Sequence, residues 1–308
     1  MKKLLCIGLL TALLLSLLSC GAKETCEETS FWDDLGRPIS LSAEDRVAAC
    51  HSSFADCWLL AGGTLVGVTD DAVKDHGLEV GDASIIGTAK TVYPEALVAS
   101  GATVALLSAD LTAHLELEET LKSLGITCAY FKVDTFSDYA SVMRRFCDVT
   151  GRQDLYERHV SAVEEKIEAI RSRIPKEETR TVLLMRAYSS GIKAKSDDNL
   201  AGLILKEFGF RNLADAHPSL LEDMSLEHIV SADPDYILVL TMGNEAAARK
   251  YLAESLEQNP AFTSLEAVRE GRYVVLPKEL FHYKPNERWD ESYEYLAKLL
   301  YPTVLVTP

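Results

Sequence analysis

Short apolar segments alternate with longer amphipathic segments along the first half of the chain. Near-continuous apolar runs are typical of parallel strands buried on both faces, and the amphipathic stretches predict helices that cover such a sheet. We expect strands at 46–50, 65–68, 104–107 and 126–131, and helices at 54–61, 115–124 and 139–150. Gly62 and Gly125 follow two of these helical patterns and end them. The first half is therefore predicted to be one α/β unit.

The longest helical pattern of the chain covers residues 154–173. Apolar side chains recur at spacings of three and four residues on one face, at Val160, Val163, Ile167, Ile170 and Ile174. A helix of this length spans about 30 Å, the width of a small domain. Pro175 then stops the pattern.

The strand and helix alternation restarts after residue 179. Strands are expected at 181–185, 236–240 and 273–275, and helices at 200–208, 246–257 and 290–300. The whole pattern predicts an α/β fold of two Rossmann-like lobes with parallel sheets, joined by one long α-helix. We place the N-terminal lobe at 38–151, the bridging helix at 152–175 and the C-terminal lobe at 176–308. The crevice between two such lobes is where a ligand is expected to bind.

The first twenty residues have the order of a secretory signal. Lys2 and Lys3 precede an apolar run at 4–18, which is too short to span about 30 Å of hydrocarbon comfortably. The residues Leu-Leu-Ser-Cys at 17–20 resemble the lipobox of bacterial lipoproteins, in which the signal is cut before the cysteine and the cysteine is lipidated. This resemblance implies a signal peptide at 1–19, a lipidated (palmitate-bearing) Cys20 and a tether at 20–37. An ordinary signal peptide with an incidental Cys20 is the alternative.

The net charge bears on the expected partners, and the cysteine content bears on the expected disulfides. Without residues 1–19 the chain carries 29 basic and 47 acidic side chains, a net charge of −18. Such a surface repels nucleic acid, so a nucleic-acid partner is not expected, and only the lipid would hold the chain at the membrane. Five further cysteines follow Cys20, at Cys26, Cys50, Cys57, Cys128 and Cys147. Buried free thiols are favoured, and one disulfide is the alternative.

Several phrases of the sequence resemble those of a known transport family. Arg46-Val47, a helix ending at Gly62-Gly63 and Leu65-Val66-Gly67-Val68-Thr69 form an opening phrase, and Pro94-Glu95-Ala96-Leu97 leads into the strand at 104–107. Ser225-Leu226-Glu227-His228-Ile229 and Ala232-Asp233-Pro234-Asp235-Tyr236 repeat that phrase in the second half. In this order they resemble the substrate-binding lipoproteins of ABC importers for iron–siderophore, haem and cobalamin. The resemblance covers about residues 38–300, although Ala102-Thr103 replaces the usual Pro-Asp.

The resemblance implies a capture protein without chemistry of its own. It would work as a lipid-anchored monomer on the extracytoplasmic face of the cell membrane and deliver an iron chelate, most simply a ferric siderophore, to a permease dimer. Haem or cobalamin binding by the same mechanism is the alternative. No resident cofactor is expected.

Glu95 and Glu227 hold matching places in the two halves, each at the start of a helix. In the family, one surface glutamate on each lobe docks against arginines of the permease. A purely local reading is that both carboxylates favour the positive amino end of a helix.

The ligand site is expected on loops at the carboxyl ends of the strands. The candidates in this sequence are Ser52, Ser53, Phe54, Lys90, Ser108, Arg186, Tyr188, Thr241, His282, Tyr283 and Lys284. Arginine and lysine pair with carboxylates or catecholates. One of His282 and Tyr283 is a candidate ligand to the iron of a ferric chelate, since adjacent side chains on an extended segment point in opposite directions.

Two other classes of function are less well supported by the sequence. A bare zinc or manganese receptor needs three or four converging ligands, whereas the seven histidines are scattered. An exported hydrolase lacks support because there is no G-x-S-x-G or H-E-x-x-H motif. We therefore do not expect an enzyme.

Overall fold

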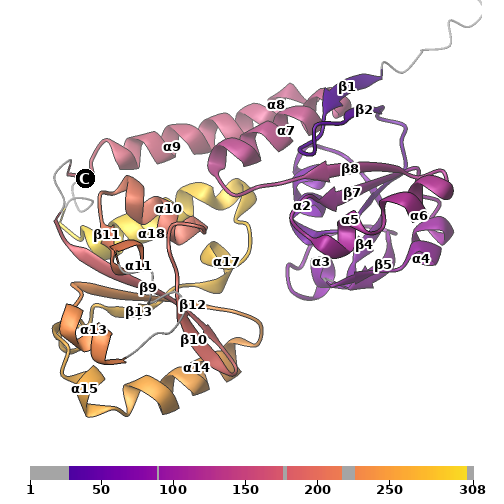
Figure 1. Ribbon diagram of the computed structural model, residues 1–308. Helices are drawn as coiled ribbons and strands as arrows, with labels where there is room; N and C mark the ends of the chain where they lie inside the picture. Colours follow the sequence, from indigo (N-terminus) through magenta and orange to yellow (C-terminus); the bar gives the residue numbers. More distant parts are fainter. Residues whose placement is uncertain (1–27, 89, 176–178, 217–225, 304–308) are drawn as a thin grey trace, which may run out of the picture.

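The computed structural model describes residues 28–88, 90–175, 179–216 and 226–303. Cys20, Cys26 and the predicted signal peptide lie outside these ranges. Figure 1 shows two α/β lobes with a helical run passing above both of them. Within the described residues each lobe has its own sheet, and a two-stranded hairpin precedes the first lobe.

The N-terminal lobe is built on a six-stranded sheet in the order β6-β5-β4-β3-β7-β8. Its strands are β3 (Val47–Ala49), β4 (Leu65–Thr69), β5 (Ser84–Thr88), β6 (Thr91–Val92), β7 (Val104–Ser108) and β8 (Thr127–Phe131). All neighbours pair in parallel except β5 and β6. Every residue of β7 is buried, as the near-continuous apolar run predicted.

Helices cover both faces of this sheet. They are α2 (Ser52–Leu60), α3 (Asp70–Lys74), α4 (Pro94–Ala99), α5 (Thr112–Leu115), α6 (Glu118–Ser123) and α7 (Phe136–Thr150). The single helix predicted at 115–124 is therefore two short helices with a break at Glu116 and Leu117. The break follows His114, which is buried and bonded to the end of β7, so its turn is held against the sheet.

The C-terminal lobe has the strand order β10-β9-β12-β13, with β11 paired to β9. Its strands are β9 (Thr181–Tyr188), β10 (Gly191–Ala194), β11 (Arg211–Asn212), β12 (Tyr236–Thr241) and β13 (Tyr273–Val275). β12 pairs in parallel with both β9 and β13, and only β10 runs antiparallel. The predicted parallel α/β class is confirmed in both lobes.

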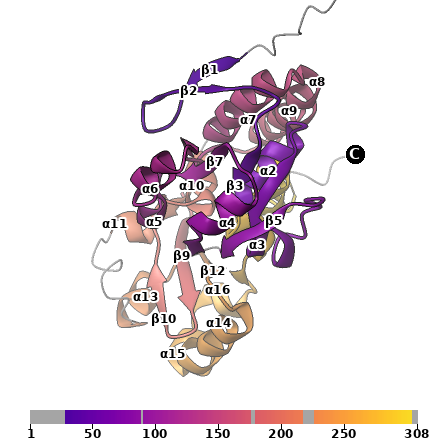
Figure 2. The same ribbon diagram turned by 90° about the vertical axis from the view of Figure 1, so that its right-hand side faces the viewer.

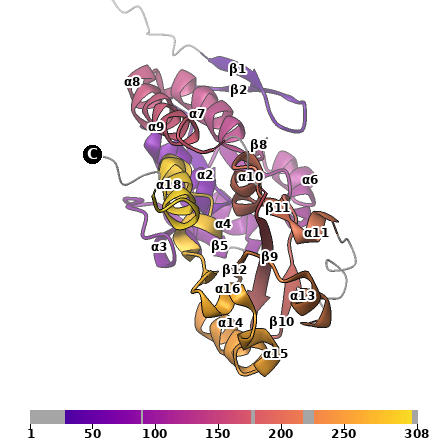
Figure 3. The same ribbon diagram turned by 90° about the vertical axis from the view of Figure 1, so that its left-hand side faces the viewer.

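Helical segments surround this second sheet. They are α10 (Leu200–Glu207), α11 (Leu213–Ala216), α13 (Leu226–Ala232), α14 (Glu245–Leu252), η2 (Ala253–Glu257), α15 (Pro260–Thr263), α16 (Glu266–Arg269), α17 (Lys278–Phe281), η3 (Asn286–Arg288) and α18 (Trp289–Leu300). Figure 3 shows α18 below the helical run that links the lobes.

That helical run extends without interruption from Gln153 to Arg171, as α8 (Gln153–Tyr156), a π-helical turn η1 (Glu157–Ser161) and α9 (Ala162–Arg171). We call this run the bridging helix. Val160, Val163 and Ile167 of the predicted apolar face are buried in a hydrophobic cluster that contains residues of both lobes. The π-helical turn was not foreseen, since the apolar spacing there fits an α-helix.

The folded part of the chain begins within the segment that was predicted to be a tether, residues 20–37. β1 (Thr29–Trp32) and β2 (Pro38–Leu41) form an antiparallel hairpin, and Figures 1 and 2 show it beside the end of the bridging helix near α7. The ring centroids of Phe31 and Phe131 are 6.2 Å apart, so the hairpin packs on the edge strand β8. Residues 29–37 therefore belong to the folded part of the chain rather than to a polar tether.

The four cysteines in the described ranges, Cys50, Cys57, Cys128 and Cys147, are free and buried. Burial raises the pKa of Cys128 and of Cys147 to about 11, so both are protonated thiols at neutral pH. The preference for buried thiols is confirmed for these four residues.

Candidate functional site

The loops at the carboxyl ends of the strands bring the two lobes into contact. The His76 and Tyr283 ring centroids are 4.3 Å apart, and Lys284 Nζ lies 3.3 Å from Asp134 Oδ1. Ser53 and Asn286 are joined by hydrogen bonds. We call this region the inter-lobe seam, formed by His51, Ser52, Ser53, His76, Asp134, Tyr283, Lys284 and Asn286.

On the N-terminal lobe the seam is organised by His51, which precedes α2. Its Nδ1 accepts a hydrogen bond from the Ser53 backbone N–H at 3.2 Å and so caps the helix. Because Nδ1 is an acceptor, the proton of the neutral ring sits on Nε2. Burial lowers the pKa of His51 to about 4, with neighbouring His114, Lys284 and His76 acting in the same direction. His51 is therefore a neutral donor at pH 7.

Ser52 and Ser108 lie at neighbouring strand ends of the same lobe. Ser52 Oγ is 3.1 Å from His76 Nε2, which orients that imidazole toward Tyr283. The Ser108 backbone N–H donates to His114 Nδ1 at 2.9 Å. His76 was not among the predicted site residues, because it follows a short helix and nothing in its local sequence marks it.

On the C-terminal lobe the seam is formed by the loop after α17. Lys278 Nζ lies 4.9 Å from the Tyr283 ring centroid and donates to the Gly243 carbonyl at 2.9 Å. Burial lowers the pKa of His282 to about 4, and the charges of Lys278, Arg186 and His76 lower it further. Two cations therefore lie near an imidazole that is uncharged at neutral pH.

The remaining predicted site residues are half-buried, exposed or fully buried. Tyr188 is half-buried at the end of β9, and Lys90 lies in the exposed turn between β5 and β6. Thr241, at the end of β12, is 1% exposed, and its Oγ1 has no hydrogen-bond partner among the described residues. Phe54 is 3% exposed and packs 5.7 Å from Phe131 between ring centroids. Phe54 thus belongs to the core, directly beneath the seam, since its ring centroid is 5.2 Å from that of His51.

Glu95 and Glu227 are both exposed in the first turn of their helices, α4 and α13. The surface around Glu95 is apolar: Tyr93 is 49% exposed and Val98 is 49% exposed. Neither carboxylate takes part in the contacts of the inter-lobe seam described above.

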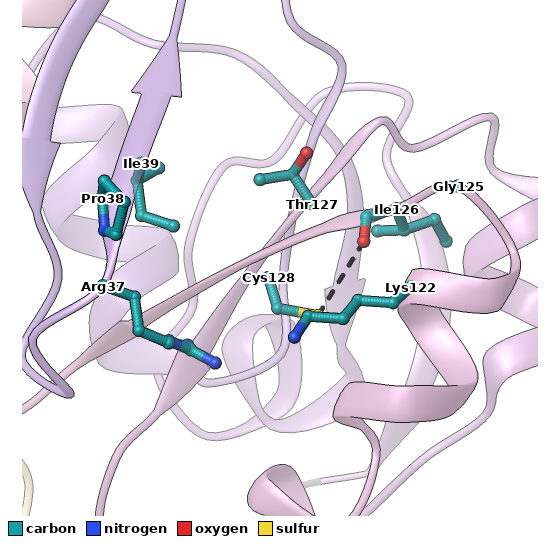
Figure 4. Close-up of a pocket in the computed structure, with 8 residues that line it drawn as sticks. All are labelled: Arg37, Pro38, Ile39, Lys122, Gly125, Ile126, Thr127 and Cys128. Carbon is teal, nitrogen blue, oxygen red and sulfur yellow. Dashed lines mark hydrogen bonds between the residues drawn. The ribbon is translucent and has the colours of Figure 1, made fainter.

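Two described cavities lie away from the seam. One, of about 450 Å³, opens between β2 and the start of β8, and Figure 4 shows Arg37 and Lys122 reaching toward Cys128 there. Lys122 pairs with Glu118, and Arg37 pairs with Glu118 and Asp33, so both cations already have carboxylate partners. The second, of about 290 Å³, lies under the bridging helix between Phe136, Trp289 and Tyr293. Neither cavity is assigned to the ligand.

Within the described ranges, no group of three or more His, Cys, Asp or Glu side chains is arranged to hold a metal ion. No helix in those ranges is long and apolar enough to cross a membrane. The seam itself combines basic, aromatic and hydroxyl groups from the two lobes.

Two proteins of Bacillus subtilis are similar to this chain over most of its length. The Fe(3+)-citrate-binding protein YfmC of Bacillus subtilis (strain 168) is 23% identical over 257 residues, covering 82% of this chain and 79% of that protein. The putative ABC transporter substrate-binding lipoprotein YhfQ of the same organism is 25% identical over 294 residues, covering 88% of this chain and 89% of that protein.

A solved structure is similar over almost its whole length. The siderophore-binding protein BauB, bound to two molecules of acinetobactin and ferric iron, has a TM-score of 0.70 at 16% identity. The match covers 89% of this chain and 98% of BauB, which establishes the shared fold. The family of periplasmic binding proteins matches residues 47–280, most of the chain. This chain belongs to the periplasmic binding protein family.

Proposed function

We propose that this chain captures an anionic ferric chelate at the inter-lobe seam and delivers it to an ABC permease. The observation that carries the proposal is the meeting of His76 and Tyr283, one from each lobe, with their ring centroids 4.3 Å apart. A ligand bound there contacts both lobes at once. YfmC, a relative over most of its length, is named for binding ferric citrate, which is an anionic chelate.

The charges at the seam support an anionic ligand. The protein as a whole has a net charge of −16, yet Arg186, Lys278 and Lys284 lie at or beside the seam. Lys284 is paired with Asp134, and a bound carboxylate or catecholate would compete for that lysine. Arginine adds a bidentate contact to such groups. The neutral imidazoles of His51 and His282 supply hydrogen bonds without the cost of burying further charge.

A thermal-shift panel tests the proposal. The purified protein is heated with ferric citrate, a ferric hydroxamate, a ferric catecholate, haem, cobalamin or zinc chloride. A chelate present at about 100 times its Kd should stabilise the folded state by about 2.7 kcal/mol and raise Tm. Arg186→Ala should weaken binding of that chelate about tenfold or more, while Arg269→Ala on α16 should leave it unchanged. A shift with zinc alone would contradict the proposal.

We further propose that Glu95 and Glu227 dock the loaded protein, as a monomer, on the permease dimer. Both carboxylates are exposed, and the apolar surface of Tyr93 and Val98 beside Glu95 suits a protein partner. The double variant Glu95→Ala, Glu227→Ala should abolish uptake of the chelate by cells and leave its Kd unchanged. A raised Kd would instead assign these side chains to the binding site. Glu119→Ala with Glu254→Ala, also exposed on separate lobes, is the matched control.

We also propose that the chain is anchored through Cys20 on the extracytoplasmic face of the cell membrane, with residues 1–19 removed. Support comes from the lipobox-like sequence at 17–20 and from the relative YhfQ, named as a lipoprotein. Labelled palmitate should be incorporated by the wild-type protein and not by Cys20→Ala. Incorporation into Cys20→Ala would contradict the anchor assignment.

A further inference from the structure

The loop between α17 and α18 begins firmly attached to the C-terminal lobe. The backbone N–H groups of His282 and Tyr283 both donate to the Lys278 carbonyl, at 2.9 and 3.2 Å. Lys278 in turn donates from Nζ to the Gly243 carbonyl at 2.9 Å. The first residues of the loop are therefore held on α17, next to the end of β12.

The same loop ends on the N-terminal lobe, at Asn286. Ser53 Oγ donates to Asn286 Oδ1 at 3.1 Å, and Asn286 Nδ2 donates to the Ser53 carbonyl at 3.2 Å and to Asp56 Oδ2 at 2.7 Å. Ser53 is 3% exposed and Asn286 is 1% exposed. These bonds are shielded from water, so breaking them leaves buried polar groups without partners.

The backbone at Asn286 restricts which residues can make this contact. Its φ is +49°, in the left-handed region that asparagine and glycine tolerate best. Among these, only asparagine also offers a donor and an acceptor. An aspartate would bring a second carboxylate against Asp56, whose pKa is already raised, chiefly by burial.

The residues between the two attachments face the seam. Tyr283 lies against His76, and Lys284 pairs with Asp134. Figure 1 shows α17 and α2 on the facing sides of the two lobes, so the loop crosses between them. A change in lobe separation must therefore change the placement of Tyr283 and Lys284.

We infer that Asn286 is a positioning residue, which anchors the ligand-facing loop of the C-terminal lobe to helix α2 of the N-terminal lobe through Ser53 and Asp56. The inference rests on the proposed function for the statement that this loop faces the ligand. Asn286 is too deeply buried to meet a ligand itself, so it acts through Tyr283 and Lys284. It also joins two ligand-facing segments directly, since Ser53 follows His51 and Ser52.

The test combines hydrogen exchange of the free protein with binding of ferric citrate. Asn286→Gly keeps the left-handed backbone and removes all three side-chain bonds. We expect amide exchange across residues 282–287 to accelerate tenfold or more, with β7 and β12 unchanged, and Kd for ferric citrate to rise about tenfold. The matched control is Asn259→Gly, which removes a helix cap on the C-terminal lobe and should change neither quantity at the seam.

The partner residue provides a second route if Asn286→Gly does not fold. Asp56→Asn keeps an acceptor for Asn286 Nδ2 and should preserve both slow exchange and affinity. Asp56→Ala removes one of the three bonds, so it should change exchange and Kd in the same direction as Asn286→Gly but by less. Faster exchange with unchanged Kd would overturn the positioning role, and raised Kd with unchanged exchange would make Asn286 a direct contact. If the wild-type protein bound no chelate, the proposed function would fail, and exchange at 282–287 alone would decide whether the anchor exists.

Discussion

At the scale of single residues, the seam shows which contacts local sequence can and cannot reveal. Ser53 was predicted because it follows a strand, where ligand loops are expected, and Tyr283 and Lys284 because their segment resembles the last ligand-contacting loop of the family. Their partners His76 and Asp134 were not predicted, and neither was the bond between Ser53 and Asn286, since each contact joins residues far apart in the sequence.

Asp33 is the clearest case of a single residue with a structural role. It is 4% exposed; Oδ1 accepts from the Leu35 and Arg37 backbone N–H groups, and Oδ2 from the Arg37 guanidinium and the Tyr130 N–H. Asp33→Ala leaves Arg37 with Glu118 as its remaining carboxylate partner and leaves the buried Tyr130 N–H without an acceptor. The free energy of unfolding should therefore fall by about 3 kcal/mol, measured in urea titrations.

The exposed Asp75 offers a control for that change. Asp75→Ala should stay within about 0.5 kcal/mol of wild type. A loss below about 1 kcal/mol for Asp33→Ala would mean that the hairpin does not contribute to the stability of the edge strand β8.

At the scale of elements, the buried strands were the most predictable part of the fold. The strand predicted at 273–275 is β13 without a shift, and β7 and β12 differ from prediction by one residue at the end. Continuous apolar runs identify such strands because both faces are covered. The β1–β2 hairpin was missed, since each of its strands has four residues and its burial depends on contact with β8, which is distant in the sequence.

Helix α7 begins three residues before its predicted start because of a capping box. Thr135 Oγ1 accepts from the Asp138 N–H at 3.2 Å, and Asp138 Oδ2 accepts from the Thr135 N–H at 2.8 Å. Thr135→Ala should lower the unfolding free energy by about 1 kcal/mol, measured by thermal or urea denaturation. Thr263→Ala, at the exposed end of α15, is the control, and equal losses for both variants would contradict a specific cap.

At the scale of the whole molecule, three buried or half-buried histidines predict sensitivity to mild acid. The pKa values of His51, His114 and His282 are lowered to about 4, mainly by burial. An unfolded chain binds these protons near pH 6.5, whereas the folded protein binds them only near pH 4. Stability is therefore fully present above pH 6.5 and is lost as the pH falls toward 4.

The contribution of His114 to this loss of stability in acid can be measured separately. It is 2% exposed, and protonation of Nδ1 would break its bond from the Ser108 N–H. Asn at this position keeps an acceptor and does not titrate, so His114→Asn should lose less stability between pH 6.5 and 4.5 than wild type, by about 1–3 kcal/mol. His228→Asn on the exposed face of α13 should follow the wild-type curve, and identical curves for His114→Asn would refute the assignment.

The hydrophobic cluster beneath the bridging helix has a consequence for how this protein can be divided. Phe146 and Val149 from one lobe, Leu184 and Leu296 from the other, and Val163 from the helix share one continuous interior. The hydrophobic side chains of each half make part of their contacts with the other half. A fragment that contains only one half would therefore expose a large hydrophobic surface to water. The protein should therefore melt as one calorimetric unit, even though its sheets are separate.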